Sequence, residues 1–137
     1  MPPEVEWVRT WLTKAKRDLS AARRLIAEPP ILAEIACFHA QQAAEKSLKG
    51  FLVYHEVEFE KVHAIRYLLD LCIGIDDEFE RLRERAEPLT RYAILGRYPA
   101  PGAEVTQAEA TAAVEVAAGV SEFVLSRLPQ QVRPAGD

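Results

Sequence analysis

The sequence of 137 residues lacks the features of several common classes of protein. No apolar run approaches the roughly 20 residues of a membrane-spanning helix, and the first residues lack the basic and apolar regions of a signal peptide. We therefore expect a cytoplasmic protein. The two cysteines, Cys37 and Cys72, lie far apart in apolar surroundings. This placement predicts buried, reduced thiols rather than a disulfide or a cysteine metal site.

The motifs of several enzyme classes are absent as well. The six glycines are scattered singly, so neither of the glycine-rich phosphate-binding loops is present. Glu60 and His63 have the Glu-x-x-His spacing of di-iron bundles, but such sites need a second pair, which is missing. We therefore expect no metal and no cofactor. The serines within helical patterns have no nearby base, which argues against nucleophilic catalysis.

Charge of either sign is unevenly distributed along the chain, although the formal net charge is only −4. Residues 1–28 carry six basic and four acidic groups, whereas residues 56–87 carry five basic and ten acidic groups. Binding nucleic acid along a whole surface usually needs a broad basic face. The sequence therefore leaves room only for a local basic groove.

What the sequence does contain is a central helix around residues 36–49, free of glycine and proline and rich in strong helix formers. At about 100° per residue, small side chains form one stripe that would let another helix approach closely. Its members are Ala36, Ala40, Ala43, Ser47 and Gly50. A larger apolar stripe holds Cys37, Ala44, Leu48, Phe51 and Leu52. The opposite arc is a narrow polar seam of His39, Gln42, Lys46 and Lys49, with Glu45 at its edge.

Other apolar repeats predict helices over residues 4–27, 62–73, 76–96 and 106–128, and the central helix extends to about His55. Asp76 and the Thr106–Glu109 capping box mark two of the helix starts. Pro88 should kink or split the fourth helix, and residues 97–102 form a turn-rich loop. The prediction is an all-α antiparallel bundle of about five helices, a four-helix up-and-down core with one short extra helix. Residues 1–129 form a single domain, followed by a disordered tail over residues 130–137.

The three histidines are the candidates for acid–base chemistry. His39 lies on the polar seam, one face-repeat from Lys46, and a solvated or interface role is favoured over catalysis. His63 begins the third predicted helix, where it can equally cap or pack. His55 ends the central helix on its apolar side and is interpreted as a packing residue.

One run resembles a known family signature: Cys-Phe-His-Ala-Gln-Gln-Ala-Ala-Glu-Lys-Ser-Leu-Lys, residues 37–49, is similar to the signature of HEPN domains. The similarity covers nearly the whole chain in the expected order. Supporting pieces are Trp11-Leu12, Lys14-Ala15, Asp18-Leu19, His63, Leu68-Leu69 and Arg97-Tyr98-Pro99. The resemblance implies a helical bundle that commonly dimerises. Many HEPN proteins are encoded beside a minimal nucleotidyltransferase in toxin–antitoxin-like pairs, and nucleotide binding has been proposed for the class.

Other HEPN proteins are metal-independent ribonucleases with an Arg-x(4–6)-His motif, in which the histidine assists attack by the RNA 2′-hydroxyl and the arginine stabilises charge. This sequence departs from that pattern. None of its histidines has an arginine four to seven positions before it, and none follows Arg91 or Arg97. Ala100 also stands where the family often has an aspartate after Arg-Tyr-Pro. The departures favour a binding module over an enzyme.

Three hypotheses follow. The first is a homodimeric module that binds a nucleotidyltransferase-like partner and a nucleotide. Its candidate ligand-binding residues supply charged donors and a stacking face: Lys46, Lys49, Arg91, Arg97 and Tyr98. The second is an RNA-cleaving toxin with a rearranged pair, His39 or His63 with Arg97. The third is a purely structural dimer without a ligand.

Overall fold

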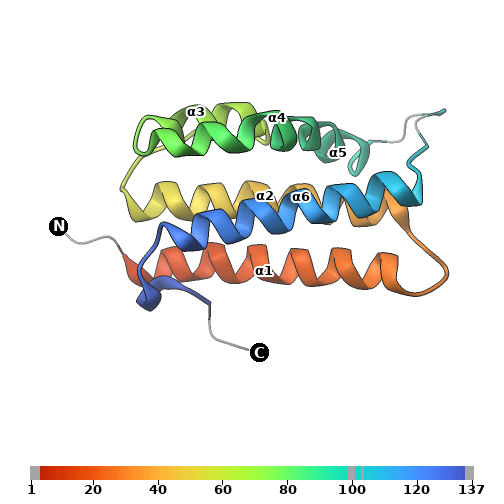
Figure 1. Ribbon diagram of the computed structural model, residues 1–137, viewed down its shortest axis with the longest axis horizontal. Coiled ribbons are helices and arrows are strands. Elements are labelled where there is room, and N and C mark those ends of the chain that lie inside the picture. Colours follow the sequence, from red (N-terminus) through yellow and green to blue (C-terminus); the bar gives the residue numbers. More distant parts are fainter. Residues whose placement is uncertain (1–3, 99–100, 103, 135–137) are drawn as a thin grey trace.

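A computed structural model describes residues 4–98, 101–102 and 104–134, and across these residues the chain forms helices and connections without a strand. Three long helices, α1 (Val5–Ala27), α2 (Ala33–Tyr54) and α6 (Gln107–Ser126), make up most of the bundle. Figure 1 shows α2 and α6 running antiparallel to α1. Among the described residues, no helix is both long enough and apolar enough to cross a membrane.

The fourth position of the bundle is taken by a segmented helical run that is parallel to α1 (Figure 1). The run consists of η1 (Asp77–Leu82), α4 (Arg83–Ala86), η2 (Glu87–Leu89) and α5 (Thr90–Leu95). Pro88 lies in η2, so the predicted split at this proline is confirmed. The short extra helix is α3 (Ile65–Ile73), which packs on α2. The predicted all-α antiparallel bundle of four helices and one short helix is therefore confirmed.

Helix α2 is the centre of the bundle, where it contacts α1, α3, α5 and α6. Its stripe of small residues is buried, and at Gly50 it meets α1, in line with the prediction that another helix approaches closely there. A Cβ atom added to Gly50 would lie 2.7 Å from Leu12 Cδ2, so the Leu12 side chain packs directly on this glycine and would have to shift for a larger residue. The larger apolar stripe is buried as well. Close approach by small residues thus sets the α1–α2 spacing.

The two cysteines are free and fully buried, in agreement with the prediction. Burial raises the pKa of the Cys37 thiol to about 11 and that of the Cys72 thiol to about 12. Because the thiolate is the reactive form, both cysteines are unreactive residues of the core.

The start of α3 differs from the prediction. The helix begins at Ile65 rather than at residue 62, so His63 lies in the preceding connection and does not begin a helix. The His63 carbonyl accepts a hydrogen bond from Gln41 Nε2 at 3.1 Å, and the Ile65 amide donates to Thr90 Oγ1 at 3.0 Å. These bonds to α2 and α5 hold the connection outside the helical conformation.

The segment after α6 also differs from the prediction of a disordered tail. Residues 130–132 form η3 (Gln130–Val132), and Val132 is fully buried. The Arg9 guanidinium donates to the Gln131 carbonyl, and Arg133 Nη2 donates to the Leu125 carbonyl at 2.8 Å. Residues 130–134 are therefore part of the packed domain, because an apolar side chain and two arginines tie them to α1 and α6. The last three tail residues, 135–137, lie outside the described residues, as do residues 99 and 100 of the predicted loop.

Candidate functional site on the polar face of α2

The polar face of α2 carries a cluster that joins it to α1, which we call the Asp18 cluster: Asp18, His39 and Lys46. Asp18 Oδ1 lies 2.8 Å from His39 Nδ1, and Asp18 Oδ2 accepts from Lys46 Nζ at 2.6 Å. One carboxylate of α1 therefore bridges two side chains of α2. The three side chains are partly exposed, His39 most of all at 31%. In a neutral imidazole, a proton on Nδ1 directed at Asp18 leaves Nε2 as an acceptor.

A second group, the Glu45 cluster, consists of Glu45, Gln41, Gln42 and Lys49 of α2 together with His63 from the connection before α3. Glu45 Oε2 accepts from Lys49 Nζ at 2.8 Å, and Glu45 Oε1 accepts from Gln41 Nε2 at 3.1 Å. His63 Nδ1 lies 3.0 Å from Glu45 Oε1, and Gln42 Nε2 donates to Gln41 Oε1 at 2.6 Å. Of the polar seam predicted for α2, Gln42, Lys49 and the edge residue Glu45 are therefore buried.

The charge on Glu45 is stabilised although its side chain is only 4% exposed. Burial by itself would raise the pKa of this carboxyl, but hydrogen bonds from Lys49 and Gln41 outweigh burial and hold the pKa below its ordinary value. Lys49 Nζ also lies 5.5 Å from the centre of the Trp11 ring and 5.6 Å from that of Phe59. This candidate ligand-binding lysine is therefore enclosed by a carboxylate and two aromatic faces.

Arg91 belongs to a third group, at the start of α6. Its Nη1 lies 3.1 Å from Glu109 Oε2, and the same oxygen accepts from the Tyr92 hydroxyl at 2.5 Å. Burial and this hydrogen bond raise the pKa of Tyr92. Thr106 Oγ1 accepts from the Glu109 amide at 3.0 Å, which confirms Thr106 as the N-cap of the predicted capping box, whereas the Glu109 carboxylate bonds Tyr92 and Arg91. Arg91 thus ties α5 to α6.

Arg97 lies against Phe38, the residue before His39. Its guanidinium carbon is 5.1 Å from the centre of the Phe38 ring, and its Nη1 donates to the Ala93 carbonyl at 2.7 Å. The Phe38 ring in turn lies 5.6 Å from the His39 ring. A Cβ atom on Gly96 would lie 2.0 Å from Phe38 Cδ1, so glycine is required for this close approach. Tyr98, the next residue along, is 66% exposed.

The structure therefore sorts the candidates that sequence reasoning selects. His39 and Lys46 share Asp18, and Arg97 lies against Phe38, the residue before His39. Lys49 is enclosed, and Arg91 is bound to Glu109. Sequence reasoning did not select Asp18 as a site residue. Its signals were its place in Asp18-Leu19, one of the pieces of the family resemblance, and a lone acid in a basic stretch of α1. Its partners are 21 and 28 positions away.

The fold and these clusters define a class: a small helical bundle whose central helix carries a polar face clamped to its neighbours. A family model for the HEPN domain matches residues 8–128. Since this is most of the chain, the protein belongs to the HEPN family. Among the described residues no group of three His, Cys, Asp or Glu side chains is placed to hold a metal ion.

Two solved structures are similar to this chain. One is the crystal structure of ST0689, an archaeal HEPN homologue, with 28% identity, a TM-score of 0.72, and coverage of 88% of this chain and 96% of the other. The second is TT1696 from Thermus thermophilus, with 32% identity, a TM-score of 0.72, and coverage of 88% and 98%. No curated protein matches the sequence significantly.

Proposed function

We propose that this HEPN domain is a binding and assembly module that acts in the cytoplasm as a homodimer. In this proposal it binds a minimal nucleotidyltransferase and a nucleotide in a toxin–antitoxin-like system, and it does not cleave RNA. The proposal follows from membership of the HEPN family together with the absence of an Arg-x(4–6)-His sequence.

The observation that carries the proposal is the set of neighbours around the three histidines. His39 is bonded to Asp18, His63 to Glu45, and the His55 ring packs on Phe51 at 4.5 Å between ring centres. No ion pair or hydrogen bond of the described residues joins a histidine to an arginine. The side chain that contacts each imidazole is instead a carboxylate or an aromatic ring, and the cation that shares Asp18 with His39 is a lysine, Lys46.

Lys46, Arg97 and Tyr98 are the groups we assign to a nucleotide. Lys46 is 23% exposed at the edge of the Asp18 cluster, and Arg97 and Tyr98 are exposed at the end of α5. A phosphate accepts charge-assisted hydrogen bonds from the lysine and the arginine, and a base stacks on the tyrosine.

Titration calorimetry with ATP and AMP tests nucleotide binding. We expect binding by the wild-type protein and at least tenfold weaker binding by Arg97→Gln and Lys46→Gln. Arg24→Gln is the matched control, because Arg24 is exposed on α1 and forms no ion pair among the described residues. The affinity of this variant for the nucleotide should stay within twofold of the wild-type value. Absence of heat and of thermal stabilisation in the wild-type protein would remove nucleotide binding from the proposal.

Partner binding is tested separately by co-expression with any small nucleotidyltransferase encoded in the neighbouring reading frame. We expect the two proteins to co-purify at a fixed ratio, and sedimentation of the HEPN protein alone to show a dimer. A monomer that does not bind such a co-expressed enzyme contradicts the assembly role.

One observation favours RNA cleavage as a second candidate function. Asp18 orients the His39 ring, and Arg97 stacks on the neighbouring Phe38, so a histidine and an arginine lie on either side of one residue. If this arrangement is catalytic, purified protein cuts RNA without added metal and His39→Ala abolishes cutting. Intact RNA over a wide range of protein concentration counts against it.

A further inference from the structure

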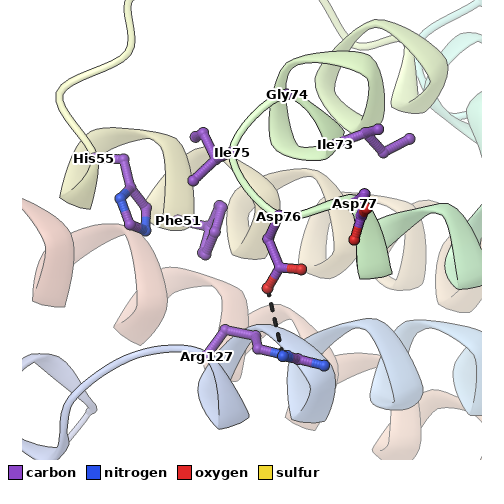
Figure 2. Close-up of a pocket in the computed structure, with 8 residues that line it drawn as sticks. All are labelled: Phe51, His55, Ile73, Gly74, Ile75, Asp76, Asp77 and Arg127. Atoms are coloured by element: carbon purple, nitrogen blue, oxygen red, sulfur yellow. Dashed lines mark ion pairs between the residues drawn. The ribbon is translucent and has the colours of Figure 1, made fainter.

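A pocket of about 560 Å³ lies where α2 and α6 end and α3 turns into η1. Figure 2 shows Phe51 and His55 of α2 on one side, Ile75 and Asp76 on the turn, and Arg127 of α6 facing Asp76. The remaining lining residues are Ile73, Gly74 and Asp77. The pocket lies about 25 Å along α2 from Phe38, at 1.5 Å per residue, and is separate from the site assigned to a nucleotide.

Three helices direct their C-terminal ends at this pocket. His55 is the C-cap of α2, Gly74 that of α3 and Arg127 that of α6, and all three line the pocket. The C-terminal end of a helix carries partial negative charge, although backbone amides already bond several of these carbonyl groups, among them those of Leu52, Cys72 and Leu125. The carboxylates of Asp76 and Asp77 add to that charge. The pocket is therefore a place where a positive charge is stabilised.

Arg127 is the one cation of the lining, and it neutralises the pocket only in part. Its Nη1 lies 3.5 Å from Asp76 Oδ2, which is long for a charge-assisted hydrogen bond. Its guanidinium carbon also lies 4.7 Å from the centre of the Phe123 ring. Arg127 can thus keep its aromatic contact while another cation takes Asp76.

The opposite wall of the pocket is apolar and aromatic. The Phe51 and His55 rings pack together, and Ile75 lies beside them, whereas Ile73 lies on the side of Asp77 (Figure 2). Burial lowers the pKa of His55, with Asp76 acting in the opposite direction. The His55 ring packed on Phe51 adds an aromatic surface to this wall. A ligand that fits has a cationic group for the aspartates and an aliphatic body for this wall.

We infer that the pocket binds a small organic cation, an aliphatic diamine or polyamine. One ammonium group lies between Asp76 and Asp77, and the methylene chain packs on Phe51 and Ile75. A volume of about 560 Å³ falls in the range of small-molecule sites. A divalent metal fits less well, because it needs more oxygen ligands than two carboxylates, and Asp76 Oδ1 already accepts from the Glu78 amide at 3.0 Å.

The inference is tested by titration calorimetry of the full chain with 1,4-diaminobutane and spermidine at low ionic strength. We expect binding by the wild-type protein and at least tenfold weaker binding by Asp76→Asn, which keeps a good helix-capping residue. Asp77→Asn should weaken binding severalfold. Glu78→Gln is the control, because it removes the same charge one residue further on, at a side chain outside the pocket.

Arg127→Gln distinguishes a built site from general attraction to an acidic surface. Removing the competing guanidinium should tighten spermidine binding severalfold. This readout does not depend on whether the aspartate variants fold. The inference is overturned by absence of binding to the wild-type protein, by equal losses in Glu78→Gln and Asp76→Asn, or by unchanged affinity in Arg127→Gln. It is also overturned if MgCl₂ displaces spermidine more effectively than NaCl of equal ionic strength, which would indicate a metal site. None of these measurements depends on nucleotide binding.

Discussion

At the scale of single residues, Glu45 shows how a buried charge can be kept in a helical core. Its two carboxylate oxygens accept from Lys49 and Gln41, and His63 lies 3.0 Å from one of them. Lys49 is in turn enclosed by Trp11 and Phe59. The Glu45–Lys49 pair connects α2 to α1 and to the connection before α3. Its loss should therefore lower the stability of the fold more than it weakens the binding of any ligand.

Glu45→Gln should lower the free energy of unfolding by about 3–5 kcal/mol, because it leaves Lys49 charged, buried and without its carboxylate. Urea denaturation monitored by circular dichroism measures the change. The double replacement Glu45→Leu with Lys49→Met is the matched comparison, and it should cost clearly less because no buried charge remains. Equal losses in the two proteins would show that the ion pair is not the cause.

The same carboxylate predicts a pH dependence. The pKa of Glu45 is lower in the folded protein than the ordinary value of 4.5. The folded state therefore binds fewer protons, and the contribution of Glu45 to stability is present above that value and lost as the pH falls through the folded pKa. We expect the difference in unfolding free energy between wild type and Glu45→Gln to be constant from pH 7 to about pH 5 and to narrow below pH 4.5. A difference that widens in acid would contradict the direction of the shift.

At the scale of elements, the position of α2 is set by the small side chains on one of its sides. Its small stripe lets α1 pack closely, and the Leu12 side chain occupies the space above Gly50. The segmented fourth helix is held differently, by Arg83. Its guanidinium donates to Glu80, Asp70 and Glu87 at 2.9, 2.6 and 2.8 Å, which raises the pKa of the arginine. These bonds join η1, α3 and η2 where Pro88 interrupts the regular helix.

Gly50→Ala should destabilise the protein by about 1–3 kcal/mol, because the new methyl group would overlap Leu12 Cδ2. Ala43→Leu, in the same stripe, should cost a similar amount. Gly119→Ala is the matched control, because a Cβ atom there meets nothing within 4 Å and alanine favours the helix by about 0.5–1 kcal/mol. Thermal unfolding of the three variants measures the effects. A stabilised Gly50→Ala protein would show that α1 and α2 are not in close contact.

At the scale of the whole molecule, the segment after α6 completes the core. Val132 is fully buried, and Arg9 and Arg133 hold the backbone on either side of it. The chain thus returns across α1 after the last long helix (Figure 1).

Val132→Ala should lower the free energy of unfolding by about 1.5–3 kcal/mol, the value of burying such a side chain, and a chain ending at Pro129 should lose at least as much. Gln130→Ala, at an exposed position of the same segment, should change stability by less than about 0.5 kcal/mol. Urea denaturation of the three proteins checks this, and an unchanged Val132→Ala protein would place the segment outside the core.

Most of the fold could be predicted from the sequence, because helical periodicity and end signals are local. The stripe of small residues, the cap at Thr106 and the break at Pro88 are all read within a few residues. The start of α3 could not be predicted, because Gln41 and Thr90, which hold the preceding connection, are 22 and 25 positions away from their partners. The packing of Val132 depends in the same way on distant helices.

By itself, the sequence determined the helical class, the buried reduced cysteines and the absence of an Arg-x(4–6)-His motif. Only the tertiary structure decided which charged side chains form ion pairs. Asp18 joins His39 and Lys46 across two helices, Lys49 is enclosed rather than available, and three helix ends converge on one pocket. The physical reason is that periodicity tells which face of a helix is polar, whereas the rotation and register of packed helices decide what that face touches.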